Sequence, residues 1–165
     1  AKALRADSKT RALGILMVTA KSSLGDEIVA LESGVDDHMA KPFDESVLQA
    51  RLRSLSRRRE RTFARNQTDL FPGLAADWSA GRIILDGSPL HLTPKELDLM
   101  QIFVQRPTMI HTYSYLWQTL WGYDSDRWEH ILAATVSSLR KKLGPKWGPL
   151  LQAHTGKGYA FNVQF

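Results

Sequence analysis

The stretch LTPKELDLM, residues 92–100, decides the fold of the second half of this 165-residue chain. Thr93 and Glu96 are spaced as a capping box, in which each side chain accepts a hydrogen bond from the other residue's backbone N–H. Pro94 occupies the first helical position, where its missing N–H costs nothing. Apolar residues then recur at helical spacing up to Val104. The stretch therefore predicts the start of an amphipathic helix with one buried face.

Short strands are predicted before this helix, and two further helices and a hairpin after it. The predicted strands are 74–78, 82–85 and 90–92, the further helices start at Thr112 and near Arg127, and the hairpin spans 150–163. In the last helix, one apolar stripe is expected to be buried: Leu132, Val136, Leu139 and Leu143. The second half is thus predicted to be an α+β domain containing a helix-turn-helix.

The first 56 residues predict alternating strands and helices. The apolar run 14–18 is typical of a parallel strand covered on both faces, and 35–40 is a second strand candidate. Helical spacing of apolar residues follows each strand, at 24–31 and 47–55. Two parallel strands are too few to hide both faces of a sheet. The segment is therefore expected to be part of an α/β domain.

The charge of the chain is concentrated in two places. The 22 basic and 17 acidic residues give a net charge of +5, yet residues 1–56 are balanced. Residues 57–68 hold five basic residues and one acidic residue, which indicates a linker, although a solvated helix end explains them equally well. Residues 127–165 hold six basic residues and one acidic residue. A domain with one basic end favours a polyanion as its partner.

Composition excludes several classes of protein. The chain has no cysteine, so it has no disulfide scaffold, and its longest apolar run is far below the roughly 18 residues of a membrane span. The triplet Asp36-Asp37-His38 stands alone and is better explained as a solvated strand edge than as a metal or acid–base site. Three tryptophans at helical positions are expected in the core: Trp117, Trp121 and Trp128. No cofactor, metal, membrane contact or enzymatic activity is expected, and the default location is cytoplasmic.

The last helix is the strongest candidate for a functional surface. Its buried stripe leaves a set of residues pointing outward or sideways: His130, Ala134, Thr135, Ser138, Arg140, Lys141 and Lys142. A helix packed on one face and basic on the other fits the DNA major groove. Lys157, between two glycines in the hairpin, can approach phosphates closely. The competing explanation is that the helix dipole alone attracts these cations to a helix C-terminus.

Several motifs in the same order resemble the OmpR/PhoB family of response regulators, which join a phosphorylatable receiver to a winged helix. The matching stretches are MVTAK (17–21), ESGVDDHMAKPF (32–43), LTPKELDLM (92–100), LWGYDSD (120–126), SLRKKLG (138–144) and TGKGYAF (155–161). The resemblance implies a flavodoxin-like receiver remnant (β-α-β-α) at 1–56, a basic linker at 57–70 and a winged-helix effector domain at 71–165.

In the receiver, the resemblance assigns Thr19 and Lys41 to the phosphate switch, and His38 to the place of the switch aromatic. It implies dimerisation through Asp36, Asp37 and Arg51. No segment matches the acidic pocket that carries the phosphoacceptor. The chain is thus either a fragment or a degenerate regulator, and a sensor histidine kinase is a partner only if the full receiver exists.

In the effector, the resemblance implies binding to double-stranded DNA and contact with RNA polymerase through residues 123–126. The expected DNA-binding set is Thr112, His130, Thr135, Ser138, Arg140, Lys141, Lys142, Thr155 and Lys157. Because Ser138 and Thr155 stand where the family has arginines, weaker or altered base readout is expected. The sequence predicts a sequence-specific, dimerising transcriptional regulator of a two-component phosphorelay. The alternative is a phosphorylation-independent dimerisation or protein-binding module with weak or lost DNA readout.

Overall fold

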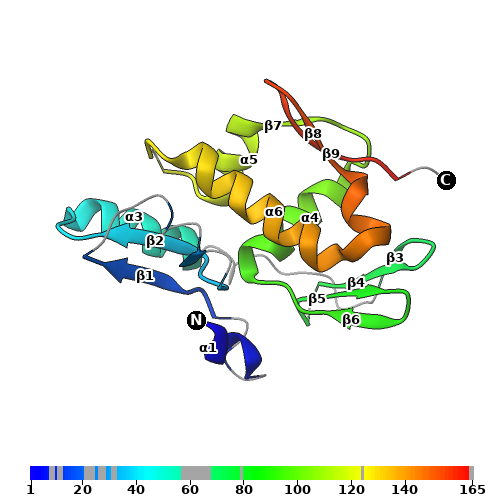
Figure 1. Ribbon diagram of the computed structural model, residues 1–165, viewed down its shortest axis with the longest axis horizontal. Helices are drawn as coiled ribbons and strands as arrows, with labels where there is room; N and C mark the ends of the chain where they lie inside the picture. Colours follow the sequence, from blue (N-terminus) through cyan, green and yellow to red (C-terminus); the bar gives the residue numbers. More distant parts are fainter. Residues whose placement is uncertain are drawn as a thin grey trace.

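The computed structural model in Figure 1 describes most of the chain. The described residues are 1–7, 10, 13–20, 25, 29–30, 33–56, 68–78, 80–123 and 125–163. Much of the predicted helix at 24–31 and residues 57–67 of the predicted linker lie outside them. Within the described ranges, no helix is long and apolar enough to cross a membrane.

The N-terminal region, residues 1–56, is a small α/β unit. It contains α1 (Lys2–Ala6), β1 (Leu16–Thr19), β2 (Asp37–Ala40) and α3 (Glu45–Ser56). The two strands are parallel, with Leu16 opposite Asp37, which confirms the predicted pairing of two parallel strands. Helix α1 is not predicted by the sequence pattern, because its five residues contain no buried side chain. The sheet has two strands in the described residues, so it cannot enclose a core by itself.

The C-terminal domain, residues 68–163, begins with a four-stranded antiparallel meander. Its strands are β3 (Thr68–Phe71), β4 (Leu74–Asp77), β5 (Arg82–Leu85) and β6 (Ser88–Leu90). Residues 68–70 were assigned to the linker on composition, and this boundary is wrong. They form β3 because Leu70 and Phe71 pack on the apolar core of the domain, a contact that charge counting does not reveal.

Three helices follow the meander: α4 (Pro94–Gln105), α5 (Tyr113–Leu120) and α6 (Trp128–Trp147). The capping box at Thr93 and Glu96 is formed in both directions. Thr112 caps α5, since its hydroxyl oxygen accepts a hydrogen bond from the Tyr115 N–H at 3.2 Å. The pair Gly144-Pro145 predicts the end of α6. Gly144 does interrupt α6 with a φ of 74°, but a further helical turn continues to Trp147 and leads into the 3-10 helix η2 (Gly148–Leu150).

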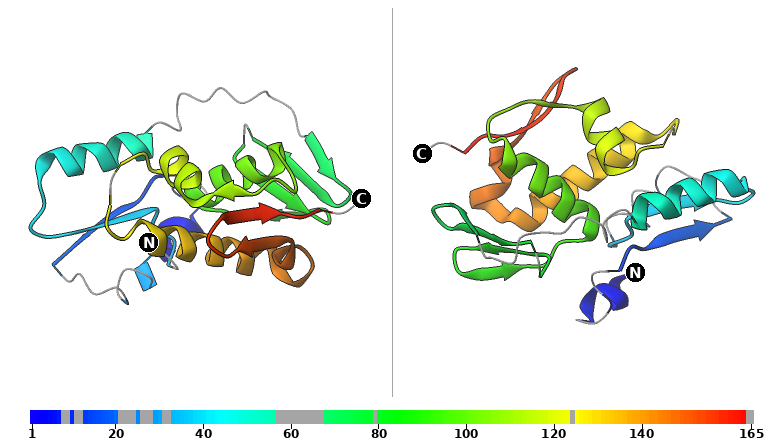
Figure 2. Two further views of the ribbon diagram at one scale, coloured as in Figure 1. Left: turned by 90° about the horizontal axis from the view of Figure 1, so that it is seen from above. Right: turned by 180° about the vertical axis from the view of Figure 1, so that it is seen from behind.

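A second, three-stranded sheet closes the C-terminal domain. Strands β8 (Leu151–His154) and β9 (Gly158–Phe161) form the predicted hairpin, and β9 also pairs with β7 (His111–Thr112). Strand β7 has only two residues, too few for any periodic signal. In the right-hand view of Figure 2 the tip of the hairpin (red) points away from the four-stranded sheet (green), whereas Phe161 of β9 packs against Phe71 of β3. The arrangement of helices and hairpin confirms the predicted winged helix-turn-helix.

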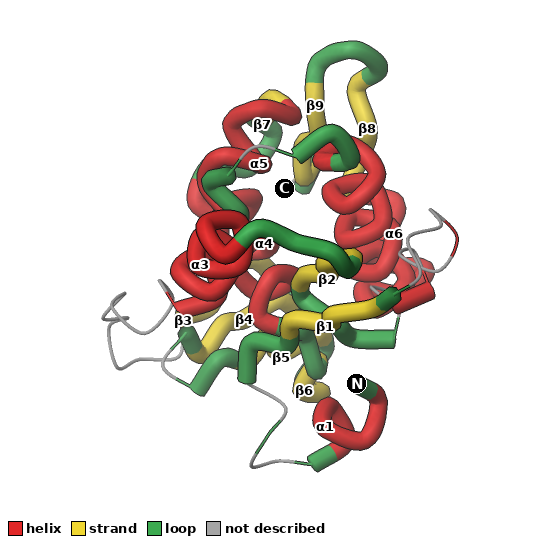
Figure 3. The backbone as a smooth tube through the Cα atoms, turned by 90° about the vertical axis from the view of Figure 1, so that its left-hand side faces the viewer, coloured by secondary structure: helices red, strands yellow, loops and turns green. Residues whose placement is uncertain are grey.

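The core of the C-terminal domain lies between the three helices and the two sheets. Trp121, Phe103 and Phe161 are the largest side chains that are fully buried there. Trp117 stacks on Trp121 with ring centroids 4.6 Å apart, which confirms their predicted place in the core. In Figure 3 the strands of the N-terminal region lie alongside the helices of this domain.

Candidate nucleic-acid interface

The inner face of α6 fixes how the helix is oriented. Four apolar residues are buried as predicted: Leu132, Val136, Leu139 and Leu143. Ile131 is also buried, and it widens the buried arc because successive residues turn by about 100° around a helix. Thr135 falls inside this wider arc. It is 7% exposed and its hydroxyl donates to the Ile131 carbonyl oxygen at 2.9 Å, so the prediction that it points outward is wrong.

The outer face of α6 is open. His130, Ala133 and Lys141 are exposed, and Ala134 and Ser137 are half-buried. Ser137 was not among the predicted residues. It follows His130 by seven positions, about two helical turns, and therefore lies on the same side. That spacing was the signal in the sequence that could have identified it.

Three predicted DNA-binding residues of α6 make contacts within the domain. The Ser138 hydroxyl donates to Glu96 Oε1 at 2.7 Å, and Lys142 Nζ lies 2.6 Å from Glu96 Oε2. Arg140 donates from Nε and Nη2 to the Leu151 carbonyl oxygen, at 3.0 and 2.6 Å. These bonds attach α6 to the start of α4 on one side and to β8 on the other.

The turn between β8 and β9 forms the tip of the wing. Thr155 and Lys157 are both exposed there, as expected for residues that meet a nucleic acid. The Lys157 N–H donates to the His154 carbonyl oxygen at 2.9 Å, and Gly156 has a φ of 71°, a left-handed conformation that favours glycine. The tip therefore presents one cation on a tight turn.

The base of the wing is packed tightly against β7. Thr112 lies opposite Gly158 in the pairing of β7 with β9, so the residue that caps α5 also adjoins the wing. A Cβ atom on Gly158 would stand 1.9 Å from the His111 carbonyl oxygen. Only a residue without a side chain allows this approach of the two strands.

The loop between α5 and α6 is anchored through Tyr123. Its carbonyl oxygen accepts a hydrogen bond from Trp117 Nε1 at 2.6 Å, and the rings of the two residues meet edge to face. Asp124 lies outside the described residues. The loop predicted to contact RNA polymerase is thus held at one end by the tryptophans of the core.

The same tyrosine joins the two regions of the molecule in a cluster of Asp37, Arg51 and Tyr123, here called the Asp37 cluster. Arg51 Nη1 lies 2.6 Å from Asp37 Oδ1 and 2.7 Å from the Tyr123 hydroxyl. The hydroxyl in turn donates to Asp37 Oδ2 at 2.6 Å. Burial raises the pKa of Asp37, and the Arg51 charge and the Tyr123 hydrogen bond oppose that rise.

A second link between the regions starts from α4. Lys95 is 3% exposed, and its Nζ donates to the Ser54 hydroxyl at 3.1 Å and to the Leu120 carbonyl oxygen. The Ser54 hydroxyl also donates to the Leu120 carbonyl oxygen at 3.2 Å. Helix α3 is thereby bound to the start of α4 and the end of α5.

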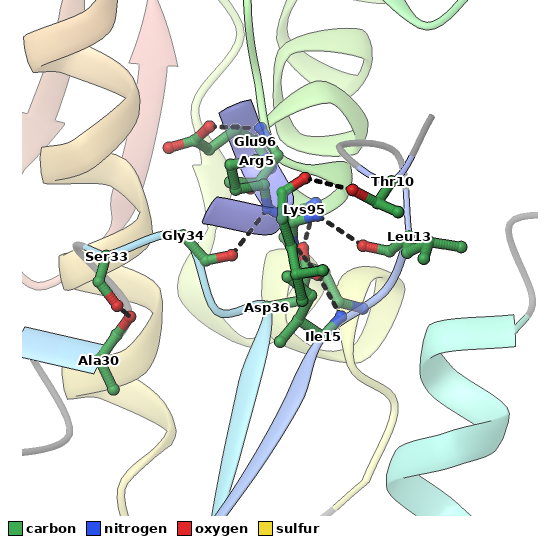
Figure 4. Close-up of polar contacts among 12 residues, drawn as sticks. Arg5, Thr10, Leu13, Ile15, Ala30, Ser33, Gly34, Asp36, Lys95 and Glu96 are labelled. Atoms are coloured by element: carbon green, nitrogen blue, oxygen red, sulfur yellow. Dashed lines mark hydrogen bonds and ion pairs between the residues drawn. The ribbon is translucent and has the colours of Figure 1, made fainter. Parts of the chain in front are cut away.

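Asp36 is buried at the same interface, between Arg5 and Lys95 (Figure 4). Its Oδ2 accepts from Arg5 Nη2 at 2.6 Å and from the Ile15 N–H at 2.7 Å, and its Oδ1 accepts from the Lys95 N–H at 3.4 Å. Burial raises the pKa of Asp36 against the charge of Arg5. The three residues that the family resemblance assigns to a dimer interface, Asp36, Asp37 and Arg51, therefore make their contacts within one chain in this structure.

Two of the three residues assigned to the receiver switch, Thr19 and Lys41, meet at the carboxyl ends of the N-terminal strands. Thr19 ends β1, and the Lys41 N–H just after β2 donates to the Thr19 carbonyl oxygen at 2.7 Å. His38 lies apart from them, buried in β2 opposite Met17. Its neighbours Asp36 and Asp37 are buried too, so the prediction of a solvated strand edge is wrong. Among the described residues, no group of three His, Asp or Glu side chains is placed to hold a metal ion.

Comparison with known proteins places the C-terminal domain in a described family. Residues 87–161 match the family "Transcriptional regulatory protein, C terminal". A transcriptional regulatory protein of Bacillus subtilis, YclJ, is 32% identical over 161 residues, which cover 93% of this chain and 70% of YclJ. The phosphate regulon regulatory protein PhoB of Pseudomonas aeruginosa is 32% identical over 164 residues, covering 99% of this chain and 71% of PhoB. The chain spans 63% of another relative, PrrA of Mycobacterium leprae.

Solved structures show the same fold. A mutant of RitR aligns with a TM-score of 0.72 over 95% of this chain and 70% of its own, at 22% identity. The DNA-binding domain of Klebsiella pneumoniae RstA, solved in complex with the RstA box, aligns with a TM-score of 0.53 over 59% of this chain and 97% of its own, also at 22% identity.

Proposed function

The chain belongs to the OmpR/PhoB family of response regulators, and from that premise we propose that it binds double-stranded DNA in a sequence-specific manner as a transcriptional regulator. Helix α6 enters the major groove with its open face, and the wing contacts the adjacent phosphates. The observation that carries the proposal is the exposure of Lys141 and Lys157 on two elements that Arg140 ties together through Leu151.

The charge distribution supports the same surface. Six basic residues against one acidic residue lie in 127–165, whereas 69–126 carries three basic and seven acidic residues. A phosphate backbone is therefore attracted to α6 and the wing and is repelled by the rest of the domain. The RstA domain, which shares the fold, is solved on its DNA site.

The further partners follow from the family. RNA polymerase is contacted through the loop at 123–126, and two copies assemble through the N-terminal region on paired sites. Because Asp37 and Arg51 are engaged with Tyr123, assembly through these side chains requires the two regions to separate first. A sensor histidine kinase acts on this regulator where a complete receiver is present.

The experiment is a fluorescence-anisotropy titration of the whole chain with a pool of labelled random duplexes, between 50 and 200 mM salt. Lys141→Ala and Lys157→Ala should each flatten the slope of log K against log salt by about one. Lys2→Ala removes the same charge from exposed helix α1 and serves as the matched control. Binding that is absent, or independent of salt, would overturn the proposal.

The same titration distinguishes the proposed regulator from the alternative, a protein-binding module with weak or lost DNA readout. The engagement of Ser138 by Glu96 favours this alternative, because it removes one of the polar side chains that were expected to reach bases. A module of this kind leaves the labelled duplex free at every salt concentration, whereas a regulator with weak readout binds it and prefers some sequences.

A further inference from the structure

The open face of α6 carries unusually short side chains for a helix that reads DNA. His130, Ala134, Ser137 and Lys141 follow at intervals of four, three and four residues, which places them on one side of the helix. Ala133 is exposed beside them. Between His130 and Lys141, the accessible part of the face therefore consists of methyl and hydroxymethyl groups.

The longer polar side chains that flank this face are held by a buried carboxylate. Glu96 is 2% exposed, and its Oε2 accepts from the Thr93 N–H at 2.7 Å in the capping box. Its Oε1 accepts from Ser138, and its Oε2 also lies beside Lys142 Nζ. Withdrawing either partner leaves a buried charge with fewer donors, which is unfavourable. Ser138 and Lys142 therefore stay with Glu96 rather than turn to the DNA.

The only arginine on the outer half of α6 is also occupied. Both Arg140 donors in contact with β8 point to one carbonyl oxygen, that of Leu151. In the major groove, guanine is read mainly by arginine or lysine, and thymine is read by apolar contact with its methyl group. Lys141 lies toward the C-terminal end of the helix, whereas base edges are contacted by the N-terminal part. Between His130 and Lys141, the face therefore presents no arginine or lysine side chain to the bases.

We propose that α6 reads thymine methyl groups through Ala133, Ala134 and the Ser137 side chain, so that the recognised positions are A·T pairs. Glu96 acts as a positioning residue, because it keeps Ser138 and Lys142 away from the bases. This inference rests on the proposed DNA-binding function and specifies the chemical class of its site.

The first experiment selects binding sites for the whole chain from random duplexes and then replaces each thymine of the selected site by deoxyuridine. Deoxyuridine pairs like thymine but lacks the C5 methyl group. Affinity should fall by about fourfold at each thymine that α6 contacts, which is the fold-change for burying one methyl-sized group. Replacements outside the protected site serve as controls and should have no effect.

Variants of α6 show which of its residues contacts each thymine methyl group. Ala133→Gly and Ala134→Gly remove the side-chain methyl group altogether, so each should abolish the sensitivity to deoxyuridine at one position. Ala80→Gly, at an exposed position between β4 and β5, is the matched control and should leave both the selected sequence and the affinity unchanged.

The role of Glu96 is tested by the salt dependence of DNA binding, because a purely structural role for Glu96 would leave that dependence unchanged. Glu96→Gln keeps the size of the side chain and removes the charge that holds Lys142. The released lysine should then add about one phosphate contact and steepen the salt slope by about one unit. Glu96→Gln combined with Lys142→Ala should restore the original slope.

The outcomes separate this inference from the proposed function. Sequence-specific binding that is insensitive to every deoxyuridine, or sites with G·C pairs at the positions that α6 protects, would overturn the inference alone. An unchanged salt slope in Glu96→Gln would overturn the role of Glu96. A chain that binds no duplex at all would overturn the proposed function, and the inference with it.

Discussion

The two regions of the molecule are stabilised in different ways. The C-terminal domain has a continuous apolar core around Trp121, Phe103 and Phe161. In the described part of the N-terminal region, the buried apolar residues are Ala30, Val35 and Met39, and buried polar groups lie beside them. Seven of its larger apolar side chains are exposed instead: Leu4, Leu13, Val18, Val29, Phe43, Val47 and Leu52. The C-terminal domain therefore folds on its own core, whereas the N-terminal region depends on polar contacts with that domain.

Removing a core side chain should give the largest difference between the regions. Leu139→Ala, at a fully buried position in α6, should lower the free energy of unfolding by about 2–5 kcal/mol, because it leaves a cavity. Leu52→Ala, at a position 49% exposed in α3, should change it by about 0.5 kcal/mol or less. Urea denaturation followed by far-ultraviolet circular dichroism, which reports on the helices of both regions, measures both. Equal losses would show that the N-terminal region has a core of its own.

Breaking the Asp37 cluster should affect only the N-terminal region. Asp37→Ala leaves the largely buried Arg51 without its carboxylate and should weaken the contact between the regions by about 3 kcal/mol. Limited trypsin digestion should then cut within residues 1–56 while the C-terminal domain stays intact. Glu45→Ala, an exposed carboxylate on the same α3 helix, is the control. If trypsin digested both regions at the same rate, the two regions would not be independently stable.

Removing a single hydroxyl group from the Asp37 cluster should have a smaller effect on the contact between the two regions. Tyr123→Phe keeps the ring against Trp117 and removes the hydroxyl that Asp37 and Arg51 share. The contact between the regions should weaken by about 1.5–3 kcal/mol, the value of a hydrogen bond to a charged group. Amide hydrogen exchange should speed up in β2 and remain slow in α4. A uniform change across both elements would count against a local effect.

A shift in pH is the mildest perturbation. Its effect on stability should have opposite signs in the two regions. The pKa values of Asp36 and Asp37 are raised by burial, so the folded N-terminal region binds more protons than its unfolded form between pH 3.8 and those raised values. Its stability should therefore rise as the pH falls into that window and decrease again as the pH rises through it.

In the C-terminal domain, the pKa of His111 is lowered by burial between the rings of Phe103 and Tyr115, partly offset by the Arg106 backbone. Below pH 6.5 the unfolded chain takes up a proton that the folded domain resists, so the stability of this domain should fall on acidification. Thermal melts between pH 7 and 5 measure the trend, and His111→Phe should flatten it. A parallel response of both regions would refute the assignment.

Local signals in the sequence predicted most of the fold. The capping box at Thr93 and the glycine at position 144 act through neighbouring residues, so their effects are visible in a short stretch. Strands β3 and β7 were missed because β3 depends on core contacts made elsewhere in the chain and β7 has only two residues.

The candidate site was predicted less well than the fold. Thr135 was misplaced because the buried arc was judged from four residues and omitted Ile131. The bonds of Glu96 to Ser138 and Lys142 span 42 and 46 residues, and no spacing rule in a single sequence encodes such pairs. Helical spacing could predict which side chains of α6 point to solvent. It could not predict which distant residues bind the side chains that point elsewhere.

The approach of Gly158 to the His111 backbone has a genetic consequence. Any side chain there would meet the carbonyl oxygen of the next strand rather than a movable side chain, so no alternative amino acid can be accommodated. A library containing every codon at position 158 should lose all but the glycine codons under selection for repression or activation of a reporter. At Gly87, where a Cβ would meet nothing within 4 Å, asparagine and aspartate should survive, since both tolerate a positive φ. Two glycines in hairpins of different sheets thus differ in mutational tolerance: one is required by space and the other only by backbone conformation.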